Sequence, residues 1–187
     1  IDLPRTSVLN FRRAVFADVA AFLRERLGEE IKLERRRAET KSLAAWEAVK
    51  RADGLVADGV EASLHAREAD AAEFFLRADS LYAAAERLDR TWVTPTISRG
   101  WVALRFALSP PALVPFAVFA RDTISPAIRM PLRAIAFAEQ ALASSAGSAE
   151  ALALRGYARQ WLGNWPGVGG ADTLIRRAEA DLQAALD

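Results

Sequence analysis

The side chains that could carry acid–base or metal chemistry are few in this sequence. His65 is the only histidine, and there is no cysteine. The nearest acidic residues, Glu61 and Glu68, are typical of a helix surface, whereas a metal site needs three or four ligands. A Ser-His-Asp triad would have to use His65, and the sequence contains no Gly-x-Ser-x-Gly turn. We therefore expect no catalytic residue, no metal site and no cofactor.

A glycine-rich stretch, 163-GNWPGVGGAD-172, is the other candidate for a chemical site. It precedes an expected helix, and helix N-termini can bind phosphate through their backbone N–H groups. Phosphate-binding loops of that kind follow a strand and have a diagnostic spacing or a lysine, and both features are missing. We interpret the stretch as a turn and expect no small-molecule substrate.

The charge balance gives no sign of a nucleic-acid-binding surface. Lys and Arg number 25 against 24 Asp and Glu, so the formal net charge is +1. Nucleic-acid binders usually concentrate an excess of positive charge, and the run of arginines at 35–37 is flanked by acidic residues. We expect no nucleic-acid partner.

The hydrophobic pattern predicts an all-α chain. Apolar residues recur at spacings of three and four, and no segment alternates with the period of two that marks a strand. Ser42, Asp70 and Ser148 have the types and positions of helix caps. Gly54 and Gly59 weaken the second helix and suggest a break near them. The expected helices cover residues 8–27, 43–64, 70–88, 95–105, 132–142, 149–161 and 174–185.

Two stretches of the chain are similar to each other. Residues 81–105 and 135–160 each contain a helix rich in small residues, then a short capped turn, then a helix with the sequence Arg-Gly-aromatic. The two copies of that motif are Arg99-Gly100-Trp101 and Arg155-Gly156-Tyr157.

This pattern resembles the tetratricopeptide repeat, and especially the divergent bacterial repeats attached to transmembrane signalling kinases and cyclases. The resemblance covers roughly residues 42–187 and implies antiparallel helix pairs stacked as a solenoid. On this interpretation residues 1–41 form an N-terminal capping helix and a charged connector. The family's proline after the second helix is missing at 88–90. The implied close contacts are those of Gly100 and Trp101 with Ala138, and of Gly156 and Tyr157 with Ala178 and Ala185.

An apolar segment at 109–131 interrupts the expected helices. Within 107-ALSPPALVPFAVFARD-122, three prolines punctuate a run of apolar side chains. Helix connections in compact domains usually have about 2–8 residues, and this segment is too apolar for disorder. We expect it to be ordered and to bury its side chains, either over the groove of its own repeats or against another protein or the edge of a bilayer. The candidate partner-binding residues are Leu113, Val114, Phe116, Val118, Phe119, Ile124 and, in the glycine-rich stretch, Trp165, which we expect to be the most exposed tryptophan.

These features predict a non-catalytic structural or interaction subunit. Its preferred form is an extrinsic polypeptide that docks on and stabilises a larger membrane-associated complex, for example an energy-converting assembly such as a photosynthetic reaction centre–antenna complex. The expected partners are other protein subunits, with the bilayer surface as a further contact. The alternative is a regulatory or sensory repeat domain that binds a peptide or protein in its concave groove.

The sequence also predicts a location beside a membrane and not across it. The longest uncharged, proline-poor part of the apolar segment, Phe116–Ala120, would rise only about 7 Å as a helix, against a hydrocarbon core of roughly 30 Å. The chain begins at Ile1, so either a leader has been removed or the sequence is a fragment. We expect the extracytoplasmic face of a bacterial membrane, with the cytoplasm as the alternative.

Overall fold

The structure is a computed structural model that describes residues 21–22, 25–28, 30–31, 34, 36–108 and 126–187. These residues form helices and turns and contain no strand, which confirms the all-α prediction. The chain divides into two compact units, Ile1–Glu39 and Thr40–Asp187. In the first unit the described residues between 21 and 38 are helical. In the described parts of the chain, no helix combines the length and hydrophobicity of a membrane span.

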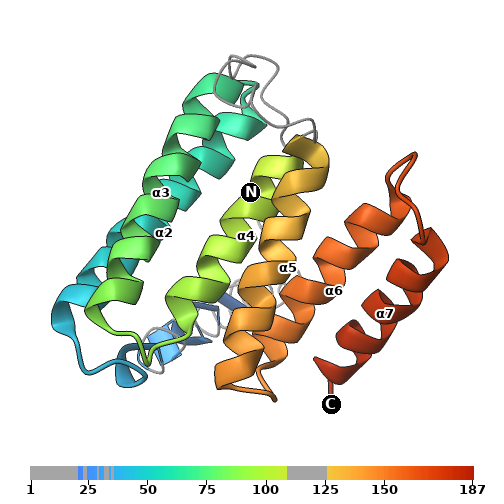
Figure 1. Cartoon of the computed structure of the whole chain (residues 1–187). Coiled ribbons are helices and arrows are strands. Elements are labelled where there is room, and N and C mark those ends of the chain that lie inside the picture. The colour runs from blue at the N-terminus through green and yellow to red at the C-terminus, as the bar shows by residue number, and fades with distance from the viewer. Residues whose placement is uncertain (1–20, 23–24, 29, 32–33, 35, 109–125) are drawn as a thin grey trace, which may run out of the picture. The chain divides into compact units, whose positions relative to one another are not determined.

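The second unit consists of antiparallel helices packed in sequential pairs (Figure 1). Within the pairs, α2 packs on α3, α4 on α5 and α6 on α7, and the pairs are joined by contacts of α3 with α4 and of α5 with α6. The helices are α2 (Leu43–Leu64), α3 (Glu68–Leu88), α4 (Thr94–Leu108), α5 (Pro126–Ser144), α6 (Ala149–Asn164) and α7 (Ala171–Ala184).

Serine side chains cap two of these helices, as predicted. The Ser42 hydroxyl accepts a hydrogen bond from the backbone N–H of Ala45 at 3.1 Å, and Ser148 does the same for Ala151 at 3.3 Å. Each bond satisfies an N–H group that has no partner within its own helix. The cap predicted at Asp70 is wrong, because α3 begins two residues earlier.

Helix α2 runs without the break predicted near Gly54 and Gly59. A Cβ atom at Gly59 would lie 2.7 Å from the ring of Phe75 on α3. The glycine therefore leaves room for a buried aromatic ring between two helices, and this packing offsets its weak helix propensity. The apolar residues that recur with a period of about 3.6 on both sides of Gly59 therefore belong to one helix.

Two buried clusters form the core of the second unit, and α4 belongs to both. The first cluster joins α2 and α3 to one face of α4, with Trp92, Val102, Phe106 and Met130 among its larger members. The second joins other residues of α4 to α5 and α6. Alanine dominates both clusters, so the helix backbones approach closely. The alanines of the second cluster are Ala103, Ala134, Ala138, Ala141, Ala151 and Ala158.

The apolar segment is shorter than the predicted 109–131, because α5 begins at Pro126 and continues through Pro131. A proline inside a helix removes the N–H that would bond the carbonyl four residues earlier. Here that carbonyl belongs to Ala127, and it accepts a hydrogen bond from the indole N–H of Trp161 on α6 at 3.1 Å. The tertiary contact supplies the donor that Pro131 lacks. The remainder of the segment, 109–125, lies outside the described residues.

The repeated Arg-Gly-aromatic motif marks two close helix contacts. A Cβ atom at Gly100 would collide with the side chain of Leu154 and lie 3.3 Å from the Cβ of Phe137. A Cβ atom at Gly156 would lie 2.7 Å from Leu182 and 3.2 Å from the carbonyl oxygen of Ala178. The contact implied between Gly156 and Ala178 is therefore confirmed. The two aromatic residues of the motif also meet, with the ring centroids of Trp101 and Tyr157 5.8 Å apart.

We predict that Gly100→Ala destabilises the fold by about 1–3 kcal/mol, because overpacking at a tight helix contact outweighs alanine's better helix propensity. Urea-induced unfolding followed by circular dichroism measures the change. Gly54→Ala is the matched control, since a Cβ atom there has no described atom within 4 Å. We expect this control to stabilise the chain by about 0.5–1 kcal/mol. A Gly100→Ala protein as stable as the control would contradict the close contact.

A cluster of hydrogen bonds at Asp89 connects the end of α3 to the residues before α2. Its carboxylate accepts from the hydroxyl of Thr40 at 2.6 Å, and from the hydroxyl and backbone N–H of Thr91 at 2.7 and 3.1 Å. The hydrogen bond from Thr40, followed by those from Thr91, lowers the pKa of Asp89 below its usual value of 3.8. The ionised form is therefore favoured in the folded chain.

A carboxylate whose folded pKa is lowered stabilises the fold above its unfolded pKa, and this stabilisation is lost as the pH falls through the folded value. We therefore expect Asp89→Asn to be less stable than the wild type at pH 7, with the difference shrinking as the pH falls below 3.8. Urea unfolding as a function of pH measures it. Glu179→Gln on the exposed face of α7 is the control. A difference that stays constant with pH would contradict the role of Asp89.

Candidate functional site

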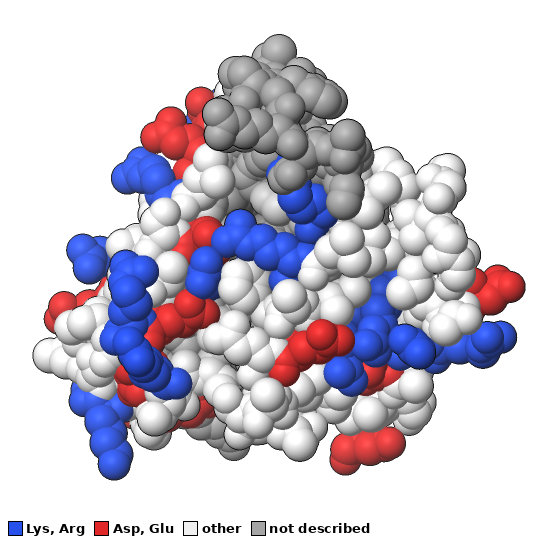
Figure 2. Space-filling model, in the orientation of Figure 1, with Lys and Arg blue, Asp and Glu red and all other residues white. Residues whose placement is uncertain are grey.

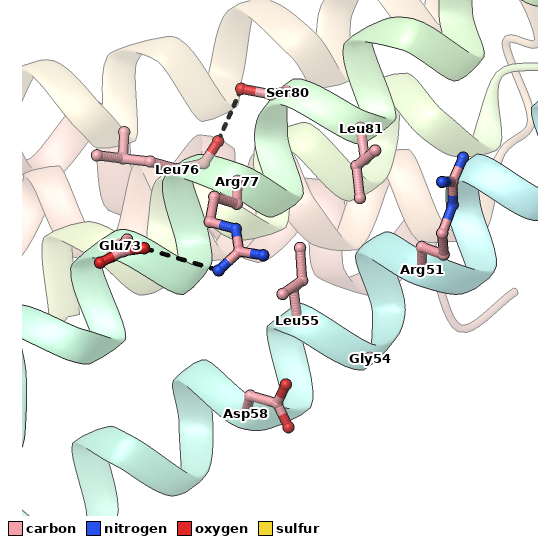
Figure 3. Close-up of a pocket in the computed structure, with 9 residues that line it drawn as sticks. All are labelled: Arg51, Gly54, Leu55, Asp58, Glu73, Leu76, Arg77, Ser80 and Leu81. Carbon is pink, nitrogen blue, oxygen red and sulfur yellow. Dashed lines mark hydrogen bonds and ion pairs between the residues drawn. The ribbon is translucent and has the colours of Figure 1, made fainter.

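A groove runs along the outer side of the first helix pair (Figure 3). Its residues recur at spacings of three and four on each helix, so each set forms one stripe along its helix. Because α2 and α3 are antiparallel neighbours, the two stripes border the same hollow, whose volume is about 740 Å³. The lining residues are Arg51, Gly54, Leu55 and Asp58 on α2, and Glu73, Leu76, Arg77, Ser80 and Leu81 on α3.

Leucine side chains form the apolar part of the groove. Leu55 and Leu81 are half-buried and pack against the first core cluster, so the core holds them in place. Leu76 exposes 51% of its surface. Nearby, the Ser80 hydroxyl donates to the backbone carbonyl of Leu76 at 3.0 Å, which keeps this hydroxyl turned to its own helix. The groove thus offers solvent a row of apolar side chains on rigid helices.

Charged side chains of both signs surround the leucines. Figure 3 shows Arg51 at the end near Leu81, and Asp58 and Glu73 at the opposite end. Arg77, in the middle, pairs with Glu73 at 3.6 Å, and both side chains are more than half exposed. An exposed pair of this kind stabilises a helix by only about 0.3–0.5 kcal/mol. It is therefore free to change partner when another molecule binds.

Of the predicted partner-binding residues, only Trp165 lies in the described part of the chain. Leu113, Val114, Phe116, Val118, Phe119 and Ile124 are outside it. Trp165 is half-buried, and its ring centroid lies 5.8 Å from that of Trp161. Trp46, Trp101 and Trp161 are half-buried too, so the expectation that Trp165 would be the most exposed tryptophan stays a prediction. Trp165 packs on Trp161, whose indole N–H donates to the Ala127 carbonyl. The structure therefore assigns Trp165 a packing contact beside α6.

The residues considered for chemistry have ordinary structural positions. His65 is exposed at the end of α2, and its Nδ1 lies 2.8 Å from the carbonyl oxygen of Glu61. Gly167 and Gly170 have the positive φ angles of a turn leading into α7. Among the described residues, no group of three or more histidine and acidic side chains is placed to hold a metal ion.

Two partly buried clusters of arginine and carboxylate side chains connect helices of the second unit. Asp181 is 6% exposed. Arg155 donates to both of its oxygens, at 2.6 and 3.0 Å, and Arg159 donates to one at 2.6 Å. The Asp181 carboxylate of α7 thus accepts hydrogen bonds from two arginines of α6, and these charge-assisted bonds connect the two helices.

Arg99, in the other copy of the motif, bridges α4 to α3 in the same way. It donates to Asp79 at 2.9 Å and to Glu86 at 2.6 Å, and Arg133 of α5 donates to Asp79 at 3.0 Å. Burial lowers the pKa of Arg99, but the hydrogen bonds and charges of Asp79 and Glu86 raise it more, so that the pKa lies above its usual value. The motif's arginines therefore connect helices as ion pairs.

On the face shown in Figure 2, positive and negative side chains of the described residues are interspersed. This mixture agrees with the near-zero net charge of the sequence. Sequence patterns alone did not identify the α2–α3 groove. The available signal was the spacing of Arg51, Leu55 and Asp58, together with a glycine in the interior of the helix.

Comparisons of the chain with protein-family models, curated proteins and solved structures find no match. The tetratricopeptide-like resemblance is therefore without support from a matched family or fold. What the structure shows is the all-α arrangement in sequential pairs.

We predict that Asp181→Ala destabilises the fold by about 3–5 kcal/mol, because it leaves two partly buried arginines without their shared carboxylate. Urea unfolding measures the loss. Glu139→Ala is the control, because its pair with Arg159 spans 3.5 Å and its side chain is 54% exposed. We expect this control to lose less than about 1 kcal/mol. Equal losses in the two variants would show that burial of the Asp181 cluster adds nothing.

Proposed function

We propose that this chain is a non-catalytic interaction subunit that holds an amphipathic helix of another protein in the α2–α3 groove. The observation that supports this most directly is the pair of outward-facing stripes, with leucines at the centre and charges around them. Helix-in-groove recognition uses this arrangement: a partner helix places its apolar face between two fixed helices, and anchors recur at spacings of three and four.

The energetics of the leucines favour a partner of this kind. Complete burial of a leucine contributes roughly 1.5–3 kcal/mol relative to full exposure. Leu76 still exposes 51% of its surface, so burial by a partner recovers about half of that amount. Leu55 and Leu81 add smaller amounts. Because both helices are already ordered by the core beneath them, little conformational entropy of this chain opposes the association.

The proposed setting is a larger assembly at a membrane surface. The sequence of the apolar segment supports this part of the proposal, with Phe116 and Phe119 as its largest candidate anchors. The assembly is an energy-converting complex, such as a photosynthetic reaction centre with its antenna, in the preferred form. In the alternative form, a tetratricopeptide-like regulatory domain, the groove receives a peptide from a signalling partner. Both forms need the same interaction with a protein helix.

The test is photo-cross-linking of the full chain in its native cells. A photoreactive residue is placed at Leu76 in the groove, at Phe116 in the apolar segment, and at Glu179, an exposed position on α7 that serves as the control. We expect Leu76 to give reproducible links to one partner, and the linked peptide to be an amphipathic helix by its sequence. The links should disappear when Leu55→Glu places a charge beside the probe.

The three positions separate the forms of the proposal. Links from Phe116 to an integral membrane protein support the membrane setting, whereas links from Phe116 only to the chain itself support the regulatory form. If Leu76 and Phe116 both give no more links than Glu179, the interaction role is wrong. Circular dichroism of Leu55→Glu confirms that the loss of links is not a loss of fold.

A further inference from the structure

Gly54 differs from the other glycines inside helices of the second unit. Four of them, in α2, α4 and α6, have a neighbour that a Cβ atom would touch: Gly59, Gly100, Gly156 and Gly163. At Gly54 a Cβ atom would have no described atom within 4 Å. The packing that explains the other glycines therefore does not explain this one.

The position of Gly54 makes its presence costly. It lies in the interior of α2, nearly midway between Leu43 and Leu64, where glycine is less favourable than alanine for helix stability. It also lines the groove between Arg51 and Leu55. Glycine is the residue that allows another backbone to approach a helix most closely. An external helix in the groove would use the space that a side chain here would fill.

We propose that the partner helix crosses α2 at Gly54 and places a small residue, Gly, Ala or Ser, against it. This inference rests on the proposed function, and it specifies the chemistry of the partner at that same groove. The distance between packed helix axes is set by the side chains at the contact, and small residues on both sides give the closest approach. Leu55 and Leu76 then bury the larger apolar side chains on either side of the crossing.

The charges at the two ends of the groove predict which end of the partner helix is acidic and which is basic. Arg51 is exposed at one end. Asp58 and Glu73 are exposed at the other. Electrostatic complementarity selects an acidic residue of the partner beside Arg51 and a basic residue beside Asp58. The preferred ligand is thus an amphipathic helix with acidic and basic ends, apolar anchors, and a small residue at the centre of its apolar stripe.

The experiment is a selection with a displayed library of amphipathic helices, each about 18 residues or roughly 27 Å long, on the intact chain. The central position of the apolar stripe and the two charged ends are randomised. Leu76→Glu is used for counter-selection, so that only binders of the groove are retained. We expect the retained helices to carry Gly, Ala or Ser at the centre, and opposite charges at the ends.

Gly54→Ala provides the decisive comparison, since it should raise the melting temperature of the free chain and so cannot fail by unfolding. We expect it to weaken the retained helices about tenfold, because one added methyl group overpacks the crossing. The double variant Arg51→Glu/Asp58→Arg should select helices with the opposite order of end charges.

The outcomes distinguish the two proposals. Some retained helices could need an intact Leu76 and still bind Gly54→Ala as tightly as the wild type, or carry large residues at the centre. Either result overturns the crossing at Gly54 and leaves the groove as a docking site. Failure to retain any helix that distinguishes the wild type from Leu76→Glu overturns both. If the double variant selects helices with the same order of end charges as the wild type, the assignment of the acidic and basic ends is wrong.

Discussion

Close approach of helix backbones at alanine and glycine is the constraint on which the second unit depends. Helix α4 contributes to both core clusters, so it must pack tightly on two sides at once. Gly100 makes this possible on one side, where Leu154 and Phe137 occupy the space of a side chain. Aromatic rings also meet in the pairs Trp101–Tyr157 and Trp161–Trp165, with ring centroids 5.8 Å apart in each.

Arginines also connect neighbouring helices of the second unit. Arg99 and Arg155 occupy equivalent places in the repeated motif, and each reaches carboxylates on a neighbouring helix. The guanidinium of Arg99 also lies 4.6 Å from the ring centroid of Phe137. Since these groups are engaged in ion pairs and ring contacts, their charges serve the fold.

The α2–α3 groove follows from the same packing. Helix α2 lies at one end of the row of helices in the second unit, and α7 lies at the other. The first cluster covers one side of α2 with α3 and α4. The groove on its other side retains partly exposed leucines because no described helix of this unit covers them. An interaction subunit needs a surface of this type: apolar, rigid, and bordered by charges that a partner can match.

The sequence by itself determined the all-α class and the caps at Ser42 and Ser148. These features depend on local hydrogen bonding and on helical periodicity, which nearby residues carry. Tertiary structure decided that α2 continues past Gly59 and that α5 continues through Pro131, because Phe75 and Trp161 come from other helices to compensate for the local cost. It also decided where the groove lies. A stripe such as Arg51, Leu55 and Asp58 looks like an ordinary helix surface until the rotation of α2 against α3 places a second stripe beside it, and that rotation is set by contacts between residues distant in the sequence.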